Sequence, residues 1–304
     1  MSVGTAIEVR RQLKARAVEL DLDFQQAVLY YAMERFLFRL SQTQWSERLV
    51  VKGAVMLRVW DAAVARPTRD IDFLGRVDNT PEAIRGIVAE CLAIQLDDGL
   101  AFESEIHAEP IIVEGRYPGV RVKVAGDLGG ARFVLRLDVG IDDAVVPDPG
   151  WVDYPVLLQD ESPRILAYQP ATAIAEKFQA MIEIGLANSR MKDYHDIWML
   201  SRTLEFVGQD LADAIRATFE RRATELPVET PSELTSQYTG QPETSRMWDT
   251  YRKGFPEPAG DLPKDLQEIA DAIAAFVMPA AISAASSVAF DKTWTPTSGW
   301  AQGS

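Results

Sequence analysis

The stretch Arg69-Asp70-Ile71-Asp72-Phe73 decides the fold, because it places two carboxylates on one face of a short strand. Side chains i and i+2 of a strand point to the same side, so Asp70 and Asp72 face one way while Ile71 and Phe73 face the core. Parallel carboxylates repel each other unless a cation lies between them. Mg²⁺ suits such hard oxygen ligands and usually binds one or two carboxylates together with substrate phosphates. The pattern indicates metal-dependent phosphate chemistry.

A glycine turn precedes this strand. Leu49-Val50-Val51 is a β-rich run that leads into Gly53, and the segment from Val55 to Trp60 is expected to form a helix. Glycine lets the backbone approach a phosphate without a Cβ in the way. The start of a helix offers free N–H groups and the positive end of its dipole. A simple strand-to-helix connection looks the same, so the turn is informative only together with the two aspartates.

A third candidate carboxylate, Asp138, lies on a predicted hairpin. Apolar residues alternate with polar ones over 120–124 and again over 133–139, and the glycines between 126 and 130 form the turn. Asp138 then falls on the polar face of the second strand. One alternative is that it pairs with Arg136, two residues away on the same face. Arg121, Lys123, Arg132 and Arg136 form a basic strip that is either solvated or a docking surface for RNA.

Composition narrows the class of protein. The chain has 304 residues and a net charge of −14, which argues against broad attachment to DNA through phosphate neutralisation. Its one cysteine, Cys91, permits no internal disulfide and fits a reducing, cytoplasmic location. The first residues lack an apolar run, so no signal peptide is expected. The Ala-rich segment 269–290 contains Asp271 and Pro279 and is expected to pack as a helix within the protein, so no membrane partner is expected.

Two domains are expected, with a boundary near residue 160 after the Pro147-Asp148-Pro149-Gly150 break. Residues 1–160 are predicted to form an α/β (α+β) domain with a small mixed sheet, and residues 161–304 a mainly helical domain. The segment 227–263 is rich in Pro, Thr, Ser and Gly, which predicts a long loop or lid with a helical insert near 247–251. The tail beyond Thr293 is expected to be poorly ordered.

Four stretches of the chain resemble one family. The sequence resembles the AbiEii/AbiGii nucleotidyltransferase toxin family, which belongs to the polymerase-β-like nucleotidyltransferase superfamily and includes the MenT toxins. The matching stretches are Val51-Lys52-Gly53-Ala54-Val55-Met56-Leu57-Arg58, Arg66-Pro67-Thr68-Arg69-Asp70-Ile71-Asp72-Phe73-Leu74-Gly75, Ala175-Glu176-Lys177-Phe178-Gln179-Ala180 and Ser189-Arg190-Met191-Lys192-Asp193-Tyr194-His195-Asp196-Ile197. The resemblance implies a nucleotidyltransferase fold in residues 1–160, with the helical domain closing the active-site cleft.

The resemblance also implies roles for the matching residues. Asp70 and Asp72 would coordinate Mg²⁺ and align the phosphates of an NTP, and Asp138 would be a second-metal ligand or base. Lys177 would contact the triphosphate, and Asp196 would support the site from the helical domain. The remaining nucleotide-binding positions would be Gly53, Ala54, Arg69 and Asp193. The family often has Gly-Gly or Gly-Ser where this chain has Gly53-Ala54, which removes a hydroxyl donor but leaves the backbone amides.

Structural alternatives exist for the helical residues. A lysine on an apolar helix stripe, as Lys177 is, commonly extends its ammonium to solvent. Asp193 and Asp196 share a helix face and could form a solvated acidic edge, and Asp193 could pair with Arg190 or Lys192. His195 is expected to be structural, because two histidines in the chain are too few for a histidine-rich metal centre.

The function implied by the family is Mg²⁺-dependent transfer of NMP from an NTP to an acceptor hydroxyl, with the tRNA 3′ end as the expected acceptor. The protein would be the toxin of a toxin–antitoxin pair and would have a cognate antitoxin as partner. Two alternatives remain open. The enzyme could place AMP on a Ser, Thr or Tyr hydroxyl of a protein, or the chain could be a non-catalytic nucleotide-binding module. The preferred NTP and the oligomeric state are not encoded in a readable pattern.

Overall fold

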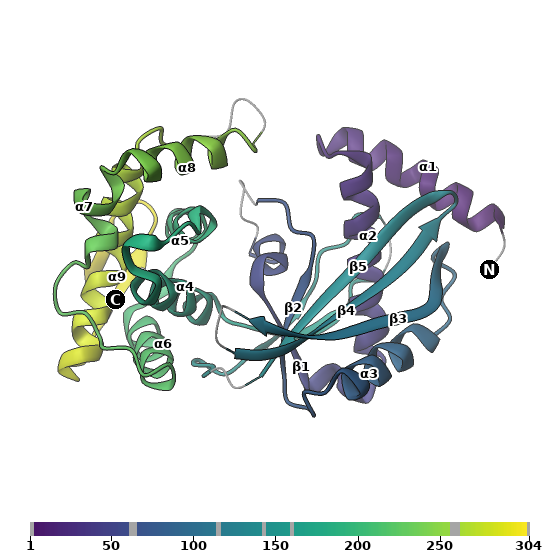
Figure 1. Cartoon of the computed structure of the whole chain (residues 1–304), viewed down its shortest axis with the longest axis horizontal. Helices are drawn as coiled ribbons and strands as arrows, with labels where there is room; N and C mark the ends of the chain where they lie inside the picture. Colours follow the sequence, from purple (N-terminus) through teal and green to yellow (C-terminus); the bar gives the residue numbers. More distant parts are fainter. Residues whose placement is uncertain are drawn as a thin grey trace. The chain divides into compact units, whose positions relative to one another are not determined.

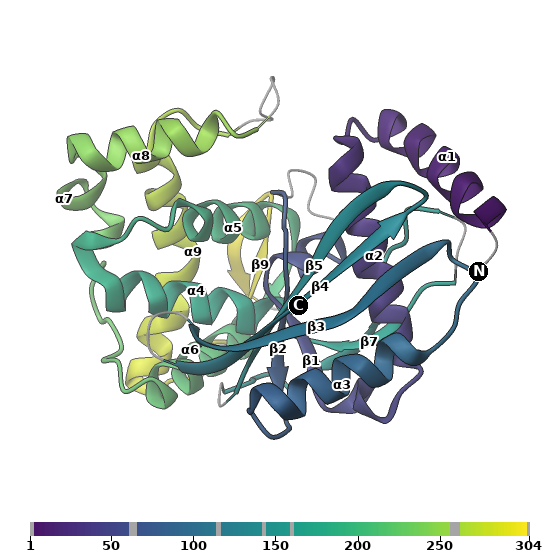
Figure 2. The same cartoon turned by 45° about the vertical axis from the view of Figure 1, so that its right-hand side comes forward.

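The computed structural model describes residues 3–60, 66–113, 117–141, 144–158, 161–255 and 262–302. The chain divides into two compact units, drawn in Figures 1 and 2. Unit 1 comprises Met1–Val59, Pro67–Asp142 and Gly150–Ala167. Unit 2 comprises Trp60–Arg66, Asp143–Pro149 and Tyr168–Ser304. Each unit therefore contains more than one segment of the sequence.

Unit 1 is built on a mixed sheet of seven strands in the order β3-β4-β5-β2-β1-β7-β6. The pairs β2–β5 and β1–β7 are parallel and the other pairs are antiparallel. The strands are β1 (Leu49–Lys52), β2 (Ile71–Gly75), β3 (Leu100–Val113), β4 (Tyr117–Leu128), β5 (Ala131–Gly140), β6 (Gly150–Asp153) and β7 (Arg164–Ala167). The expected α/β class with a mixed sheet is confirmed.

Three helices belong to unit 1: α1 (Val3–Glu19), α2 (Phe24–Ser41) and α3 (Pro81–Ala93). Asp23 is the N-cap of α2, and its carboxylate accepts hydrogen bonds from the backbone amides of Gln25 and Gln26. Thr80 is the N-cap of α3, and its hydroxyl accepts a hydrogen bond from the Ala83 amide. Helix α2 packs on β5 and on α3, and α3 packs on β3 and β4. Both helices therefore cover the same face of the sheet, and Phe36 of α2 and Phe73 of β2 are fully or almost fully buried.

The β4–β5 hairpin follows the predicted alternation. Along β5, residues 131, 133, 135, 137 and 139 are buried, whereas 132, 134 and 136 are exposed. The register pairs Val124 with Leu135 and Val122 with Leu137, so the apolar side chains of both strands meet on one face. The buried face packs on α2, and the other face carries the polar residues.

Unit 2 is mainly helical. Its helices are α4 (Pro170–Ile184), α5 (Met191–Thr203), α6 (Gly208–Arg221), α7 (Ser236–Thr239), α8 (Pro242–Arg252) and α9 (Leu266–Ser286). Helix α9 packs against α5, α6 and α7. Its length and composition would allow it to cross a membrane. However, 56% of its most apolar 18-residue window is buried inside the structure. The burial fits the expectation that this segment is an internal helix.

Three local predictions are corrected by the structure. The segment after Gly53 forms a short 3₁₀ helix, η2 (Gly53–Arg58), instead of a helix from Val55 to Trp60. The helical insert expected near 247–251 belongs to the 11-residue helix α8, which is longer than predicted. Pro242 lies in the first turn of α8 and Trp248 is buried, and residues 256–261 of the expected loop lie outside the described chain.

The C-terminal tail is ordered, contrary to expectation. Strands β9 (Lys292–Thr295) and β10 (Gly299–Gln302) form a hairpin, and β8 (Phe206–Val207) pairs with β9. Trp294 and Trp300 pack on Phe276 of α9 with ring centroids 4.9 and 5.9 Å away. The Trp300 indole also donates a hydrogen bond to the Phe276 carbonyl at 2.9 Å. These aromatic contacts hold a segment whose polar composition resembles that of a disordered tail.

Candidate functional site

One row of charged residues crosses four neighbouring strands of unit 1. Lys52 of β1 lies opposite Asp72 of β2, Asp72 lies beside Asp138 of β5, and Asp138 lies opposite Arg121 of β4. Side chains of directly paired residues point to the same face of a sheet. The sheet register therefore places two carboxylates side by side with a cation on each flank.

Asp70 completes an acidic triad with the two carboxylates of this row. One carboxylate oxygen from each of Asp70, Asp72 and Asp138 lies within 4.8 Å of the other two. Oxygens that share a divalent cation at about 2.0–2.6 Å lie up to about 4–5 Å apart, so the three side chains fit one hard cation. The prediction that these three residues come together is supported by this geometry.

The Asp138 carboxylate is held by a two-pronged ion pair. Arg121 Nε donates to Asp138 Oδ1 at 2.8 Å, and Arg121 Nη2 donates to Asp138 Oδ2 at 2.6 Å. These hydrogen bonds raise the pKa of Arg121. The partner is therefore Arg121 on the neighbouring strand and not Arg136 on the same strand. Each carboxylate oxygen keeps a further lone pair, so Asp138 can bind a cation while Arg121 fixes its orientation.

The glycine turn fits closely against the triad. Gly53 has φ +75°, and a Cβ placed on it would lie 2.0 Å from Asp72 Oδ2. Any other residue at this position would displace the Asp72 carboxylate. Ala54, next in the chain, is 6% exposed. Because η2 is a six-residue 3₁₀ helix, the expected dipole at its start is smaller than that of an α-helix, and the close approach to Asp72 is the clearer reason for glycine.

The predicted residues of unit 2 form a second, buried ionic cluster. Lys177 Nζ of α4 lies 3.1 Å from Asp193 Oδ1 and 2.7 Å from Asp196 Oδ2, both on α5. Arg66 contributes two hydrogen bonds to Asp196, from Nε at 2.9 Å and from Nη2 at 3.0 Å. Arg190 Nε donates to Asp193 Oδ2 at 2.5 Å. Both carboxylates are fully buried, so the alternative of a solvated acidic edge is wrong.

Burial and ion pairing act in opposite directions within this cluster. Burial alone would raise the pKa of Asp196, but Lys177 and Arg66 outweigh it and lower the pKa to about 2. Burial alone would lower the pKa of Lys177, but Asp196 and Asp193 outweigh it and raise the pKa. All members are therefore charged at neutral pH. Three cations face two carboxylates, which leaves one net positive charge.

His195 is a buried neutral residue next to this cluster. Its side chain is fully buried, and Nδ1 lies 2.9 Å from the Tyr251 hydroxyl. Burial lowers the pKa of His195 to about 4. Its ring also packs edge-on against Phe255, with centroids 4.9 Å apart. These contacts agree with the structural role expected for His195.

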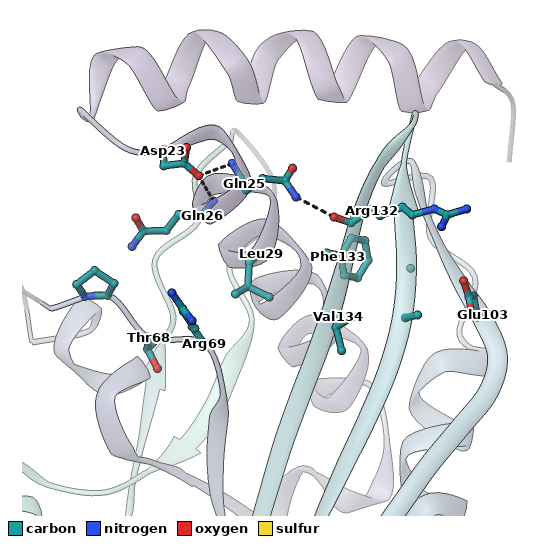
Figure 3. Close-up of a pocket in the computed structure, with 13 residues that line it drawn as sticks. Asp23, Gln25, Gln26, Leu29, Thr68, Arg69, Glu103, Arg132, Phe133 and Val134 are labelled. Atoms are coloured by element: carbon teal, nitrogen blue, oxygen red, sulfur yellow. Dashed lines mark hydrogen bonds between the residues drawn. The ribbon is translucent and has the colours of Figure 1, made fainter. Parts of the chain in front are cut away.

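The predicted site residues divide between the units. Unit 1 contains the acidic triad, the glycine turn and Arg69, which is exposed. Unit 2 contains the three residues Lys177, Asp193 and Asp196. Within each unit the structure brings the predicted residues into one cluster, apart from Arg69, which points into the neighbouring pocket shown in Figure 3.

Sequence reasoning missed three charged residues that contact or flank these clusters. Lys52 and Arg121 flank the two aspartates in the row. The place of Arg121 could have been found by counting the β4–β5 hairpin register from its turn, whereas Lys52 pairs with Asp72 across a long connection that has no such register. Arg66 pairs with Asp196 but belongs to an irregular segment of the chain, where no periodic pattern indicates which way its side chain points. The predicted basic strip is partly neutralised, because Lys123 pairs with Glu109 at 2.7 Å.

A family profile and two solved structures are similar to this chain. The profile of the family described as "Nucleotidyl transferase AbiEii toxin, Type IV TA system" matches residues 35–275. No curated protein matches the chain. A solved structure of an H. pylori protein proposed to be a nucleotidyltransferase has 16% identity and a TM-score of 0.47, and covers 88% of this chain and 97% of its own. JHP933 from Helicobacter pylori has 16% identity and a TM-score of 0.49, with 88% and 94% covered. Because the family profile spans most of the sequence, this chain belongs to the AbiEii family of nucleotidyltransferase toxins.

Proposed function

We propose that this protein transfers NMP from an NTP to the 3′ hydroxyl of an RNA, with tRNA as the expected acceptor. The observation that carries the proposal is the triad of Asp70, Asp72 and Asp138, whose oxygens lie within 4.8 Å of one another on paired strands. In this reaction the acceptor oxygen forms a bond to the α-phosphorus, and the bond from that phosphorus to the leaving pyrophosphate breaks. The hydroxyl proton leaves to solvent or to a nearby base.

Mg²⁺ is the ion that the triad is proposed to hold, and when bound it would supply charge stabilisation to the phosphate oxygens. The chain's own residues set up this arrangement. Gly53 lets the backbone approach Asp72 without a clash, and Arg121 fixes the orientation of the Asp138 carboxylate through two hydrogen bonds. Preorganised charge of this kind requires no rearrangement when the reaction occurs.

Lys177 and its neighbours are proposed to bind the triphosphate. The cluster around Lys177 contains Arg66 and Arg190 as well, and its net positive charge favours an anionic ligand. Asp196 would act through these cations by holding Lys177 and Arg66 in place, and Asp193 would hold Arg190. This role of Asp193 and Asp196 is positional, because both carboxylates are completely buried.

The biological role proposed from the family is that of a cytoplasmic toxin controlled by a cognate antitoxin. The single buried cysteine fits a reducing compartment. An antitoxin that blocks nucleotide entry and one that blocks acceptor entry would be distinguished in an assay with purified components, because only the first would prevent NTP binding.

The test is label transfer from each α-labelled NTP, supplied separately, into total tRNA or into protein. The purified chain is incubated with Mg²⁺, and a parallel sample contains EDTA. The proposal expects label on tRNA with one or two of the nucleotides and none with EDTA. Label on protein alone would assign the enzyme to protein modification instead. Absence of label and of pyrophosphate release in every sample would favour the non-catalytic alternative.

A further inference from the structure

A pocket of about 730 Å³ lies beside the acidic triad in unit 1. Its wall is formed by the first turns of α2, by the segment that leads into β2 and by the turn end of the β4–β5 hairpin (Figure 3). The residues that the argument uses are Gln26, Leu29, Thr68, Arg69, Phe133 and Val134. Pockets of 300–1,000 Å³ are typical of sites for small molecules and for single nucleotides.

Thr68, a residue that lines the pocket, contacts the triad directly. The Thr68 hydroxyl, at the rim of the pocket, donates a hydrogen bond to Asp70 Oδ1 at 3.2 Å. Arg69 lies between these two residues in sequence, and its guanidinium is directed towards α2 in Figure 3. A ligand in the pocket therefore lies next to one of the carboxylates proposed to hold the metal.

The exposed face of β5 runs from the acidic triad to the pocket. Residues 132, 134 and 136 are exposed and point to the same side as Asp138, because side chains two apart share a face. Val134 lies four residues before Asp138, which corresponds to about 13 Å along a strand. Arg132 and Arg136 flank Val134, and neither forms an ion pair within the described part of the chain. A line of positive charge therefore runs along β5 from the triad to the pocket.

The chemistry of the pocket suits a nucleotide. Val134 is 47% exposed on the outer face of β5 and provides an apolar surface for the face of a base, while Leu29 and Phe133 line the pocket from the α2 side of the strand. The Gln26 Nε2 donates a hydrogen bond to the Tyr30 hydroxyl at 2.7 Å, which holds its side-chain carbonyl as an acceptor for a base edge, and Arg69 offers a cation for a phosphate. The Gln25 amide is already engaged with the Arg132 carbonyl at 2.9 Å, which fastens α2 to β5 (dashed line in Figure 3).

We propose that this pocket binds a nucleotide upstream of the 3′-terminal residue of a single-stranded RNA acceptor. The strand would run along β5 with its phosphates near Arg136 and Arg69, and its terminal hydroxyl would reach the acidic triad. This proposal rests on the proposed function, because it assigns the acceptor side of the same site. A peptide acceptor fits less well. The backbone of a peptide carries no repeating negative charge, so it offers nothing to arginines that form no ion pair within the described part of the chain.

The test measures binding of RNA directly, so that it does not depend on catalysis. A fluorescein-labelled single-stranded oligoribonucleotide is titrated with the full-length chain and followed by fluorescence anisotropy. Val134→Glu places a negative charge on the floor of the pocket and is expected to weaken binding by about tenfold. Ile112→Glu is the matched control, because it makes the same change at another exposed strand residue of unit 1, which is 63% exposed.

A second variant tests the charged track. Arg136→Gln should weaken binding uniformly across RNA sequences and lower the slope of log K against log salt by about one, as expected for one lost phosphate contact. Circular dichroism of each variant confirms that the sheet is retained. Because Val134 and Arg136 are exposed, neither change disturbs the core.

The outcomes separate this proposal from the proposed function. If Val134→Glu binds RNA as tightly as Ile112→Glu does, or if Arg136→Gln leaves the salt slope unchanged, the acceptor pocket is refuted even when the wild-type chain labels tRNA. If both variants weaken RNA binding but the wild-type chain transfers no label, the pocket stands and the proposed reaction fails. Loss of protein labelling in Val134→Glu with unchanged RNA binding would assign the pocket to a peptide and overturn the proposal.

Discussion

The buried Asp196 carboxylate provides a quantitative test of the unit 2 cluster. Asp196 is fully buried and accepts hydrogen bonds from Arg66 at 2.9 and 3.0 Å and lies 2.7 Å from Lys177 Nζ. Replacing it with asparagine keeps the volume of the side chain but removes its charge. Lys177 then retains only Asp193 as an ion-pair partner, and Arg66 loses the carboxylate to which it donates its hydrogen bonds.

The size of the effect follows from the pKa of the carboxyl group. The difference between the ordinary value of 3.8 and about 2 corresponds to about 2–3 kcal/mol in favour of the charged form in the folded protein. Two buried cations also lose their partner, and breaking a buried ion pair by removing one member typically costs about 3–5 kcal/mol. We therefore expect Asp196→Asn to lower the free energy of unfolding by about 3–4 kcal/mol.

Urea denaturation followed by tryptophan fluorescence measures this change, because Trp198 and Trp248 are buried in unit 2. Asp213→Asn is the control. Asp213 pairs with Arg216 at 3.1 Å on an accessible helix face, where side chains are 38% and 30% exposed, so its loss should cost less than about 1 kcal/mol. An Asp196→Asn variant within 1 kcal/mol of the wild type would refute the account of the cluster as a structural support.

Three further predictions concern the triad, the buried histidine and the C-terminal hairpin. Arg121→Gln should weaken Mn²⁺ binding, measured by electron paramagnetic resonance, by about tenfold, because Asp138 loses the partner that orients it; unchanged affinity would contradict this role. His195 is neutral when folded with a pKa of about 4, against 6.5 when unfolded, so the unfolded chain binds the extra proton and stability falls as pH drops through that window. The loss should reach about 1–2 kcal/mol between pH 6.5 and 5 and be absent in His195→Gln, as measured by urea titration at each pH. Trp300→Ala should lower the free energy of unfolding by about 2–3 kcal/mol through lost packing on Phe276, and a smaller change than 1 kcal/mol would show that the hairpin is only loosely attached.

Periodicity predicts the sheet face on which each aspartate of the acidic triad lies, but not that the three meet. The i, i+2 spacing placed Asp70 and Asp72 on one face, and strand alternation placed Asp138 on the polar face of its hairpin. The parallel pairing of β2 with β5 joins strands far apart in the sequence, and no local pattern encodes it. Arg121 as the partner of Asp138 depends on the antiparallel register across β4 and β5, which local spacing along β5 alone could not supply.

The missed features are those that tertiary contacts determine. The C-terminal segment has the Gly, Ser and Thr content of a mobile tail, but Trp294 and Trp300 bury their rings against α9. The length of helix α8 was underestimated, because Pro, Glu and Thr dominate its first turn and resemble a loop. Proline is nevertheless well suited to the first position of a helix. Arg66 precedes β2 in an irregular stretch, so its pairing with Asp196 follows from the fold and not from spacing.

The most direct test of the central claim is nucleotidyl transfer by Asp72→Asn beside Asp97→Asn. Asp72 belongs to the triad, whereas Asp97 is an exposed carboxylate of the same unit outside it. Both variants lose one negative charge and keep their side-chain volume. The account predicts that Asp72→Asn lowers the rate of label transfer from NTP by at least about 10²-fold while Asp97→Asn retains the wild-type rate. Equal rates for the two variants would show that the acidic triad is not the site of the reaction.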